Sequence, residues 1–149
     1  MESRWRLPAP SRAGCTVTFS SPLFPFGHGL SYTTFAYSGL RVEKGSEGGL
    51  TVQVTIRNTG NVDSDEVPQV YLGAPSEIPA GVKFPVRALA AFDRVFVPAG
   101  RSRNVTLHVA PRQLQYWSTA GGKWVRASGQ GTVSVGTSSR DLRVETRID

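Results

Sequence analysis

The chain has 149 residues, with 17 lysines and arginines, 11 aspartates and glutamates and a formal net charge of +6. This length suits one domain of about 100–200 residues and leaves no room for a multidomain enzyme. The single cysteine, Cys15, excludes an internal disulfide, and no run of about 18 apolar residues predicts a membrane span. With 39% hydrophobic and 19% charged residues, the composition is typical of a folded chain.

The positive charge is scattered along the chain. Basic residues run from Arg4 to Arg147 without three in succession. Nucleic-acid-binding proteins concentrate their charge in a stripe, usually with stacking aromatic rings between the basic groups. We therefore expect no nucleic-acid partner.

Residues 1–21 are rich in Pro, Ser and Arg and show no apolar period. A secretory signal needs an apolar stretch of about 7–15 residues after its basic start, and none is present. We expect a loosely structured tail, and nothing in it indicates that Cys15 is an activated thiol. The sequence therefore leaves the localisation open.

Residues 22–34, the N-terminal strap, contain two prolines, two glycines that flank His28, and the aromatic residues Phe24, Phe26 and Tyr32. Residues that precede proline favour extended backbone, and glycine permits positive φ, so an irregular extended segment is predicted. A small domain cannot cover all of these rings, and large exposed apolar patches usually mark a partner surface. We therefore expect the strap to dock onto another domain, with the His28 imidazole hydrogen-bonded to backbone there.

Short segments of alternating apolar and polar residues follow, which is the period of half-buried antiparallel strands. They lie at 35–42, 50–56, 67–72, 105–109, 133–135 and 142–144. Pro68 indicates an edge position for its strand, because proline donates no ladder hydrogen bond. Glycine- and proline-containing turns separate the strands, and no segment has a helical period. The predicted fold of residues 35–149 is all-β, an immunoglobulin or fibronectin type III-like antiparallel sandwich of about seven strands.

The motifs Pro22-Leu-Phe-Pro-Phe-Gly-His-Gly-Leu-Ser-Tyr32, Glu66-Val-Pro-Gln-Val-Tyr-Leu-Gly73 and Phe84-Pro-Val-Arg-Ala-Leu89 resemble the C-terminal fibronectin type III-like domain of glycoside hydrolase family 3. The similarity covers about residues 22–144 and is greatest to the fungal branch. It departs from the family pattern at Ser64, where glycine is common, and at Trp117-Ser118, where Trp-Asp is common.

The resemblance implies a parent enzyme of the β-glucosidase or β-xylosidase type, commonly secreted. It also implies that the catalytic nucleophile and the acid/base lie on two preceding domains, which are expected as partners in cis and are missing here. We therefore expect a detached, non-catalytic module that stabilises and docks onto those domains. No catalytic residue, cofactor or metal is predicted for this chain.

The sequence leaves other readings open. Trp117 and Trp124 are candidates for stacking on sugar rings, which would make the chain a free-standing carbohydrate-binding or adhesive sandwich. Asn104-Val-Thr106 is an N-glycosylation sequon that matters only in a secreted chain. Asn61, Asp63 and Asp65 begin like a calcium loop, but the glycine and glutamate that such a loop needs are absent. The abrupt start of the family motif after residue 21 also fits a truncated gene product.

Overall fold

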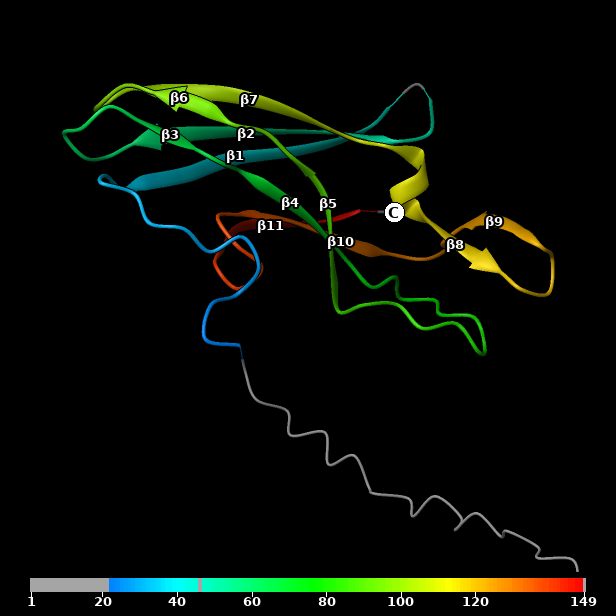
Figure 1. Ribbon diagram of the computed structural model, residues 1–149. Helices are drawn as coiled ribbons and strands as arrows, with labels where there is room; N and C mark the ends of the chain where they lie inside the picture. The colour runs from blue at the N-terminus through cyan, green and yellow to red at the C-terminus, as the bar shows by residue number, and fades with distance from the viewer. Residues whose placement is uncertain (1–21, 46, 149) are drawn as a thin grey trace, which may run out of the picture.

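The computed structural model describes residues 22–45 and 47–148 (Figure 1). The predictions for residues 1–21, Cys15 among them, lie outside these ranges. The described chain is built from strands, with a single turn of 3₁₀ helix at Pro111–Leu114. The strands are β1 Phe35–Lys44, β2 Leu50–Asn58, β3 Ser64–Glu66, β4 Gln69–Gly73, β5 Arg87–Phe92, β6 Val95–Val97, β7 Ser102–Val109, β8 Gln115–Ser118, β9 Lys123–Arg126, β10 Gly131–Gly136 and β11 Leu142–Ile148.

Two antiparallel sheets form a sandwich (Figure 1). One has three strands in the order β1-β2-β7, and the other has four in the order β11-β10-β4-β5. The predicted seven-stranded antiparallel sandwich is therefore confirmed. Two further pairs, β3 with β6 and β8 with β9, complete the strands. Among the described residues, no helix is long and apolar enough to cross a membrane.

The core lies between the two sheets and consists mainly of β-branched side chains. Every second residue of β2 is buried, as the alternation of residues 50–56 predicts. Val70 and Leu72 of β4 and Val133 and Val135 of β10 belong to the same cluster as the inward residues of β2 and β7. Valine and isoleucine keep few side-chain rotamers and pack well on a pleated surface, so they suit this narrow interior.

The prediction that Pro68 marks an edge strand is wrong. β4 lies between β10 and β5 and pairs with both. The chain leaves the small β3–β6 pair after Glu66 and joins the larger sheet at Gln69, and the buried Pro68 lies in the gap between them. Because this gap needs no ladder hydrogen bond, the missing N–H costs nothing there.

Candidate docking surface

The strap, residues 22–34, carries neither helix nor strand, but its backbone is hydrogen-bonded to the sandwich. The backbone N–H of Ser139, in the turn between β10 and β11, donates to the carbonyl of Phe26 at 2.9 Å. The Nε2 of Gln69 donates to the carbonyl of Gly27 at 3.3 Å. The strap is therefore tied to the larger sheet through main-chain carbonyls, which leaves its side chains unconstrained by these bonds.

Gln69 is the buried side chain that makes this attachment specific. Its Nε2 also donates to the carbonyl of Thr137 at 2.6 Å, and its Oε1 accepts from the hydroxyl of the buried Tyr71 at 2.6 Å. A buried amide is stable only when its polar atoms have partners. Gln69 thus joins the strap, the β10–β11 turn and β4 in one hydrogen-bonded unit.

Gly27 is required at the point of contact. Its φ is +80°, and a Cβ built there would lie only 2.2 Å from Oε1 of Gln69. Both the backbone conformation and the close approach exclude larger residues. At Gly29, in contrast, a Cβ would meet nothing within 4 Å.

A second attachment lies at the C-terminal end of the strap. The hydroxyl of Thr33 donates to Oδ1 of the buried Asn58 at 2.6 Å, and the same oxygen accepts from the N–H of Gly60 at 3.1 Å. Asn58 Nδ2 donates to the carbonyls of Val62 and Val97, at 2.8 and 3.0 Å. Asn58 therefore fixes the strap to the β2–β3 turn and to β6.

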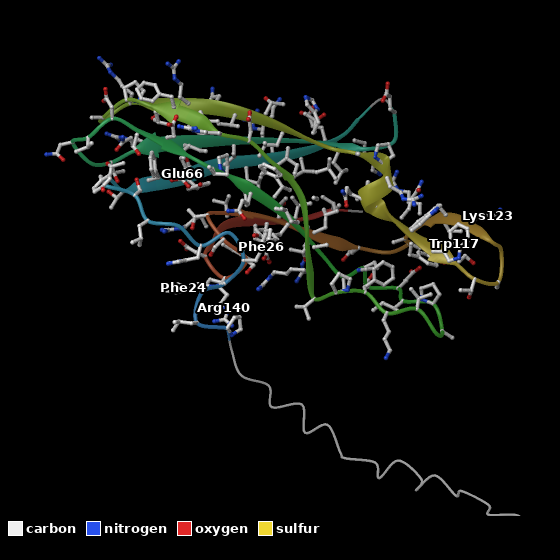
Figure 2. The ribbon with its side chains drawn as sticks, viewed as in Figure 1. Phe24, Phe26, Glu66, Trp117, Lys123 and Arg140 are labelled. Atoms are coloured by element: carbon white, nitrogen blue, oxygen red, sulfur yellow. The ribbon has the colours of Figure 1, made fainter. Side chains whose placement is uncertain are left out.

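The apolar side chains of the strap point away from the sandwich. The exposed fractions are 86% for Leu23, 65% for Phe24, 67% for Phe26, 95% for Leu30 and 96% for Tyr32. Figure 2 shows Phe24 near Arg140, and Phe26 apart from them along the strap. The next two aromatic residues, Phe35 and Tyr37, pack instead against the core.

His28 is part of this exposed surface. Its ring stacks on that of Phe24, with 5.3 Å between centroids and 21° between planes. Its backbone N–H donates to the carbonyl of Pro25 at 3.0 Å. Within residues 22–45 and 47–148 the imidazole makes no hydrogen bond, so the bond to backbone that the sequence predicts is not formed inside this domain.

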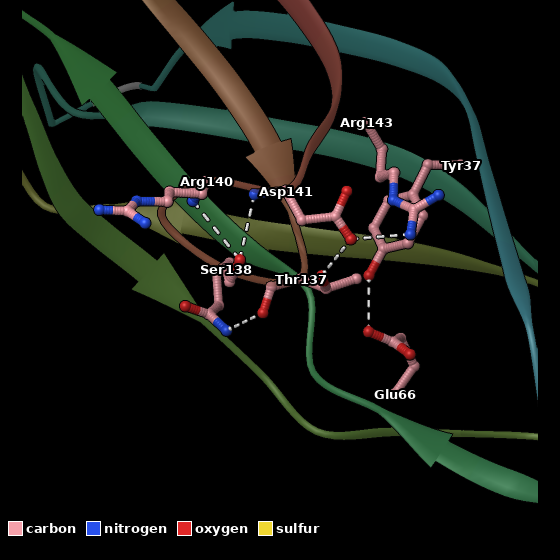
Figure 3. Close-up of polar contacts among 8 residues, drawn as sticks. Tyr37, Glu66, Thr137, Ser138, Arg140, Asp141 and Arg143 are labelled. Atoms are coloured by element: carbon pink, nitrogen blue, oxygen red, sulfur yellow. Dashed lines mark hydrogen bonds and ion pairs between the residues drawn. The ribbon is translucent and has the colours of Figure 1, made fainter. Parts of the chain in front are cut away.

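A polar network, drawn in Figure 3, lies at the end of the sandwich that carries the strap. Tyr37 donates its hydroxyl to Oε1 of the buried Glu66 at 2.9 Å. Oδ2 of Asp141 accepts from Thr137 Oγ1 at 2.8 Å and pairs with Arg143 at 2.7 Å. Burial raises the pKa of Glu66 above its ordinary value, although the bond from Tyr37 opposes this, and burial also raises the pKa of Tyr37. A cavity of about 350 Å³ separates this network from the strap.

The other acidic side chains near this end have structural contacts. Asp63 accepts the backbone N–H of Ala99 at 2.7 Å, and Asp65 pairs with Arg94 at 2.5 Å. In the described part of the chain, no three His, Cys, Asp or Glu side chains gather as a metal site would require. Asn61 and Asp63 therefore belong to the turn between β2 and β3, and Asp65 belongs to the β3–β6 pair.

Trp117 and Trp124 form a cross-strand pair in the β8–β9 hairpin, with ring centroids 5.4 Å apart in an edge-to-face arrangement. The guanidinium of Arg112 lies 3.0 Å from the centroid of the Trp124 ring, so one face of that ring is covered. Figure 2 places Trp117 at the far end of the molecule from Phe24 and Phe26. The structure therefore does not bring the tryptophans and the strap together.

Asn104 lies on β7, at the edge of the three-stranded sheet, with an exposed side chain. Its Oδ1 accepts from Thr55 Oγ1 at 2.8 Å. Thr106, the third residue of the sequon, is also exposed.

The fibronectin type III-like domain family matches residues 66–139. A probable β-glucosidase D of Aspergillus niger is 41% identical over 143 residues, which cover 83% of this chain and 18% of that protein. This chain carries the fibronectin type III-like domain of glycoside hydrolase family 3. The domain spans about a fifth of the length of the curated relatives it matches.

Solved structures agree with this assignment. A β-glucosidase from Streptomyces venezuelae, in complex with D-glucose, is 42% identical with a TM-score of 0.82, over 86% of this chain and 16% of that one. A β-D-glucoside glucohydrolase from Trichoderma reesei is 37% identical with a TM-score of 0.77, over 87% of this chain and 20% of that one. The domain is therefore similar to one part of these enzymes.

Sequence reasoning missed the residues that hold the strap in place. Asn58 continues the alternation of Leu50 to Ile56 by one further step, so a polar residue at an inward position was the available signal. Gln69 and Glu66 flank the Val-Pro break, and no local pattern shows that they are buried. The partners of Gln69 in the strap and in the β10–β11 turn lie 42 and 68 residues away from it in the sequence.

Proposed function

We propose that this fibronectin type III-like domain is a non-catalytic module that docks through its strap onto the catalytic domains of a family 3 glycosidase and stabilises them. The parent enzyme hydrolyses O-glycosyl bonds of β-glucosides, and its catalytic domains are the partners in cis. The relatives carry the name β-glucosidase and are about five times longer than the matched region.

One observation carries the proposal: the strap has a fixed backbone and outward apolar side chains. Gln69, Ser139 and Asn58 hold its main chain and Thr33, while Phe24 and Phe26 remain about two-thirds exposed. A segment that packed only on its own domain would turn such rings inward, because burying each side chain stabilises by about 1.5–3 kcal/mol. A rigid strap with outward rings is therefore suited to a second surface, which it can meet at little cost in conformational entropy.

The carboxylates of the domain support a non-catalytic role. Glycoside hydrolysis uses two carboxyl groups about 5–10 Å apart across an open, substrate-sized gap. Glu66 is buried against Tyr37, and Asp141 is bound to Thr137 and Arg143. Their partners are the domain's own side chains, as expected of structural groups.

The test is a chimera in which residues 22–148 replace the matching region of the Streptomyces venezuelae β-glucosidase. We expect the chimera to hydrolyse an aryl β-glucoside and the isolated chain to show no turnover. Phe24→Ser with Phe26→Ser should lower the melting temperature of the chimera by several degrees. The matched control is Phe92→Ser with Phe96→Ser, two exposed rings outside the strap, and it should leave the melting temperature unchanged.

Two results would count against the proposal. Turnover by the isolated chain above a heat-denatured sample would contradict a non-catalytic role. Equal melting temperatures for the strap variant and its control would contradict docking through the strap.

The parent is expected to be secreted, and Asn104 is then the proposed glycan acceptor. Its exposed position on the edge strand β7 leaves room for a glycan. Expression through a eukaryotic secretory pathway should add a glycan that Asn104→Gln removes, which an intact mass would show. An unglycosylated secreted product would refute this assignment.

A further inference from the structure

A second cavity lies at the opposite end of the sandwich from the strap. Its walls come from the 74–86 loop between β4 and β5, from the β8–β9 hairpin and from the start of β10. Its volume is about 380 Å³, within the range of small-molecule sites. The strap is bonded to the chain just beyond the other end of β10, where the N–H of Ser139 donates to the carbonyl of Phe26, so the two sites are separated by the length of this strand.

The chain holds the cavity walls together by its own hydrogen bonds. The N–H of Ser76 donates to the carbonyl of Gln130 at 2.8 Å, and the N–H of Gln130 donates back to Ser76 Oγ at 2.9 Å. Phe84 packs edge-on against Tyr116, with 5.7 Å between ring centroids. Gly129 has a φ of +83°, and a Cβ there would lie 2.5 Å from Ser76 Oγ. The 74–86 loop is therefore closed onto the segment that follows β9, and the cavity is formed before any ligand arrives.

The lining is mostly apolar and includes aromatic rings. Leu72, Phe84, Leu114, Trp124 and Ile148 supply large apolar groups. The remaining apolar wall comes from small alanine and proline side chains of β5, of the 74–86 loop and of the segment after β9. Such walls favour a flat apolar body over a sugar, whose many hydroxyl groups would each need a hydrogen-bonding partner.

The charge of the lining has one sign. Arg112 and Arg126 both line the cavity, and the described lining contains no aspartate or glutamate. Arg112 covers Trp124, and Arg126 donates one bond, at 2.9 Å, to the carbonyl of Gly48. A guanidinium has five N–H donors, so each arginine keeps donors for a ligand. Arginine forks match the geometry of a carboxylate.

We propose that this cavity binds a small planar aromatic carboxylate, with the ring between the apolar walls and the carboxylate at Arg112 and Arg126. The amides of Gln113 and Gln115 also line the cavity and make no side-chain hydrogen bond to the described residues. They provide donors and acceptors for a ring hydroxyl. The site does not depend on docking by the strap and has no part in glycoside cleavage.

The probe is trans-cinnamate, titrated into the full chain by calorimetry and by tryptophan fluorescence. We expect one site with a Kd on the order of 0.1–1 mM, as is typical of a ligand of this size. Binding should weaken as NaCl rises, because the ion pair is partly screened. Cinnamyl alcohol, which has the same ring and no charge, should bind about tenfold more weakly.

Variants locate the site. Arg126→Gln and Arg112→Gln should each weaken cinnamate binding about tenfold or more, the usual scale of a lost charged hydrogen bond. The matched control is Arg87→Gln, an exposed arginine on β5 that does not line the cavity and should bind as the unmodified chain does. Ala88→Leu, which fills the cavity from β5, should abolish binding, and circular dichroism of each variant checks that it is folded.

Three outcomes would overturn the proposal. The first is no saturable binding of cinnamate up to several times the expected Kd. The second is equal affinity for cinnamate and cinnamyl alcohol, which would remove the role of the arginines. The third is saturable binding of cellobiose that cinnamate does not displace, which would make the hairpin a sugar site. All three leave the strap and the melting temperature of the chimera untouched, so they are distinct from failure of the docking proposal.

Discussion

Gln69→Leu tests whether one buried amide holds the strap to the sandwich. The substitution keeps approximately the size of the side chain and removes three hydrogen bonds, to Thr137, Gly27 and Tyr71. The two bonds of 2.6 Å are worth about 1 kcal/mol each. The Tyr71 hydroxyl, in a residue only 2% exposed, loses its partner and adds about 1 kcal/mol or more. We expect the free energy of unfolding to fall by about 3 kcal/mol.

Urea denaturation followed by tryptophan fluorescence measures this loss. With a slope of about 1–3 kcal/mol/M for a small domain, the midpoint should move by about 1–3 M. The control is Gln53→Leu, the same substitution at an exposed position of β2, and it should change the free energy of unfolding by less than about 0.5 kcal/mol. Hydrogen exchange of the Ser139 amide, which donates to Phe26, should accelerate in the Gln69 variant alone.

A double-mutant cycle with Tyr71→Phe separates the amide from its partner. In the double variant no hydroxyl is left unpaired. The losses of unfolding free energy in the two single variants should therefore sum to about 1 kcal/mol more than the loss measured in the double variant. A loss below about 1 kcal/mol for Gln69→Leu would refute the reasoning. A cycle without coupling would also refute it, because it would mean that the 2.6 Å bond between Tyr71 and Gln69 contributes nothing to the free energy of unfolding.

Three further predictions concern the same end of the molecule. Gly27→Ala should destabilise the strap by about 1–3 kcal/mol, since it strains a positive φ and meets Gln69, and faster proteolysis between residues 22 and 34 would show it. Burial raises the pKa of Glu66, so its stabilising contribution is complete below the ordinary value of 4.5 and is lost as pH rises through the folded-state pKa. Glu66→Gln should therefore flatten the dependence of unfolding free energy on pH from about 4.5 upward, and Glu43→Gln, an exposed carboxylate on β1, should not. Phe24→Ser with Phe26→Ser should improve the solubility of the isolated chain, and unchanged aggregation in light scattering would mean that these rings are not the exposed surface.

The sandwich could be predicted because its core strands alternate. Leu50 to Ile56 and Val105 to Val109 show the period of two that burial of one sheet face imposes, and the structure buries the apolar residues of both segments. β5 was missed because Arg87–Phe92 contains three alanines, which favour strands weakly, and its role comes from pairing with β4. The β8–β9 hairpin was also missed as a strand pair.

The attachment of the strap could not be predicted, for a physical reason. The exposed rings of the strap can be predicted from its composition, because it contains more aromatic residues than a small core can cover. The buried partners Gln69 and Asn58 are defined by hydrogen bonds to carbonyls far away in the chain, and no periodicity encodes a single long-range bond. Pro68 did not predict an edge strand correctly for a related reason. A proline excludes a central strand only if the strand needs a hydrogen bond from that residue, and β4 begins one residue later, at Gln69.

The two proposed sites can operate together because β10 separates them. Docking would cover the strap at the Thr137 end of this strand, whereas Gly131 and Thr132 at its other end line the arginine-containing cavity. A partner held by Phe24 and Phe26 therefore need not close the cavity. Cinnamate binding should then be equal in the isolated chain and in the chimera. Loss of binding only in the chimera would show that the docked domains reach across the sandwich to the 74–86 loop.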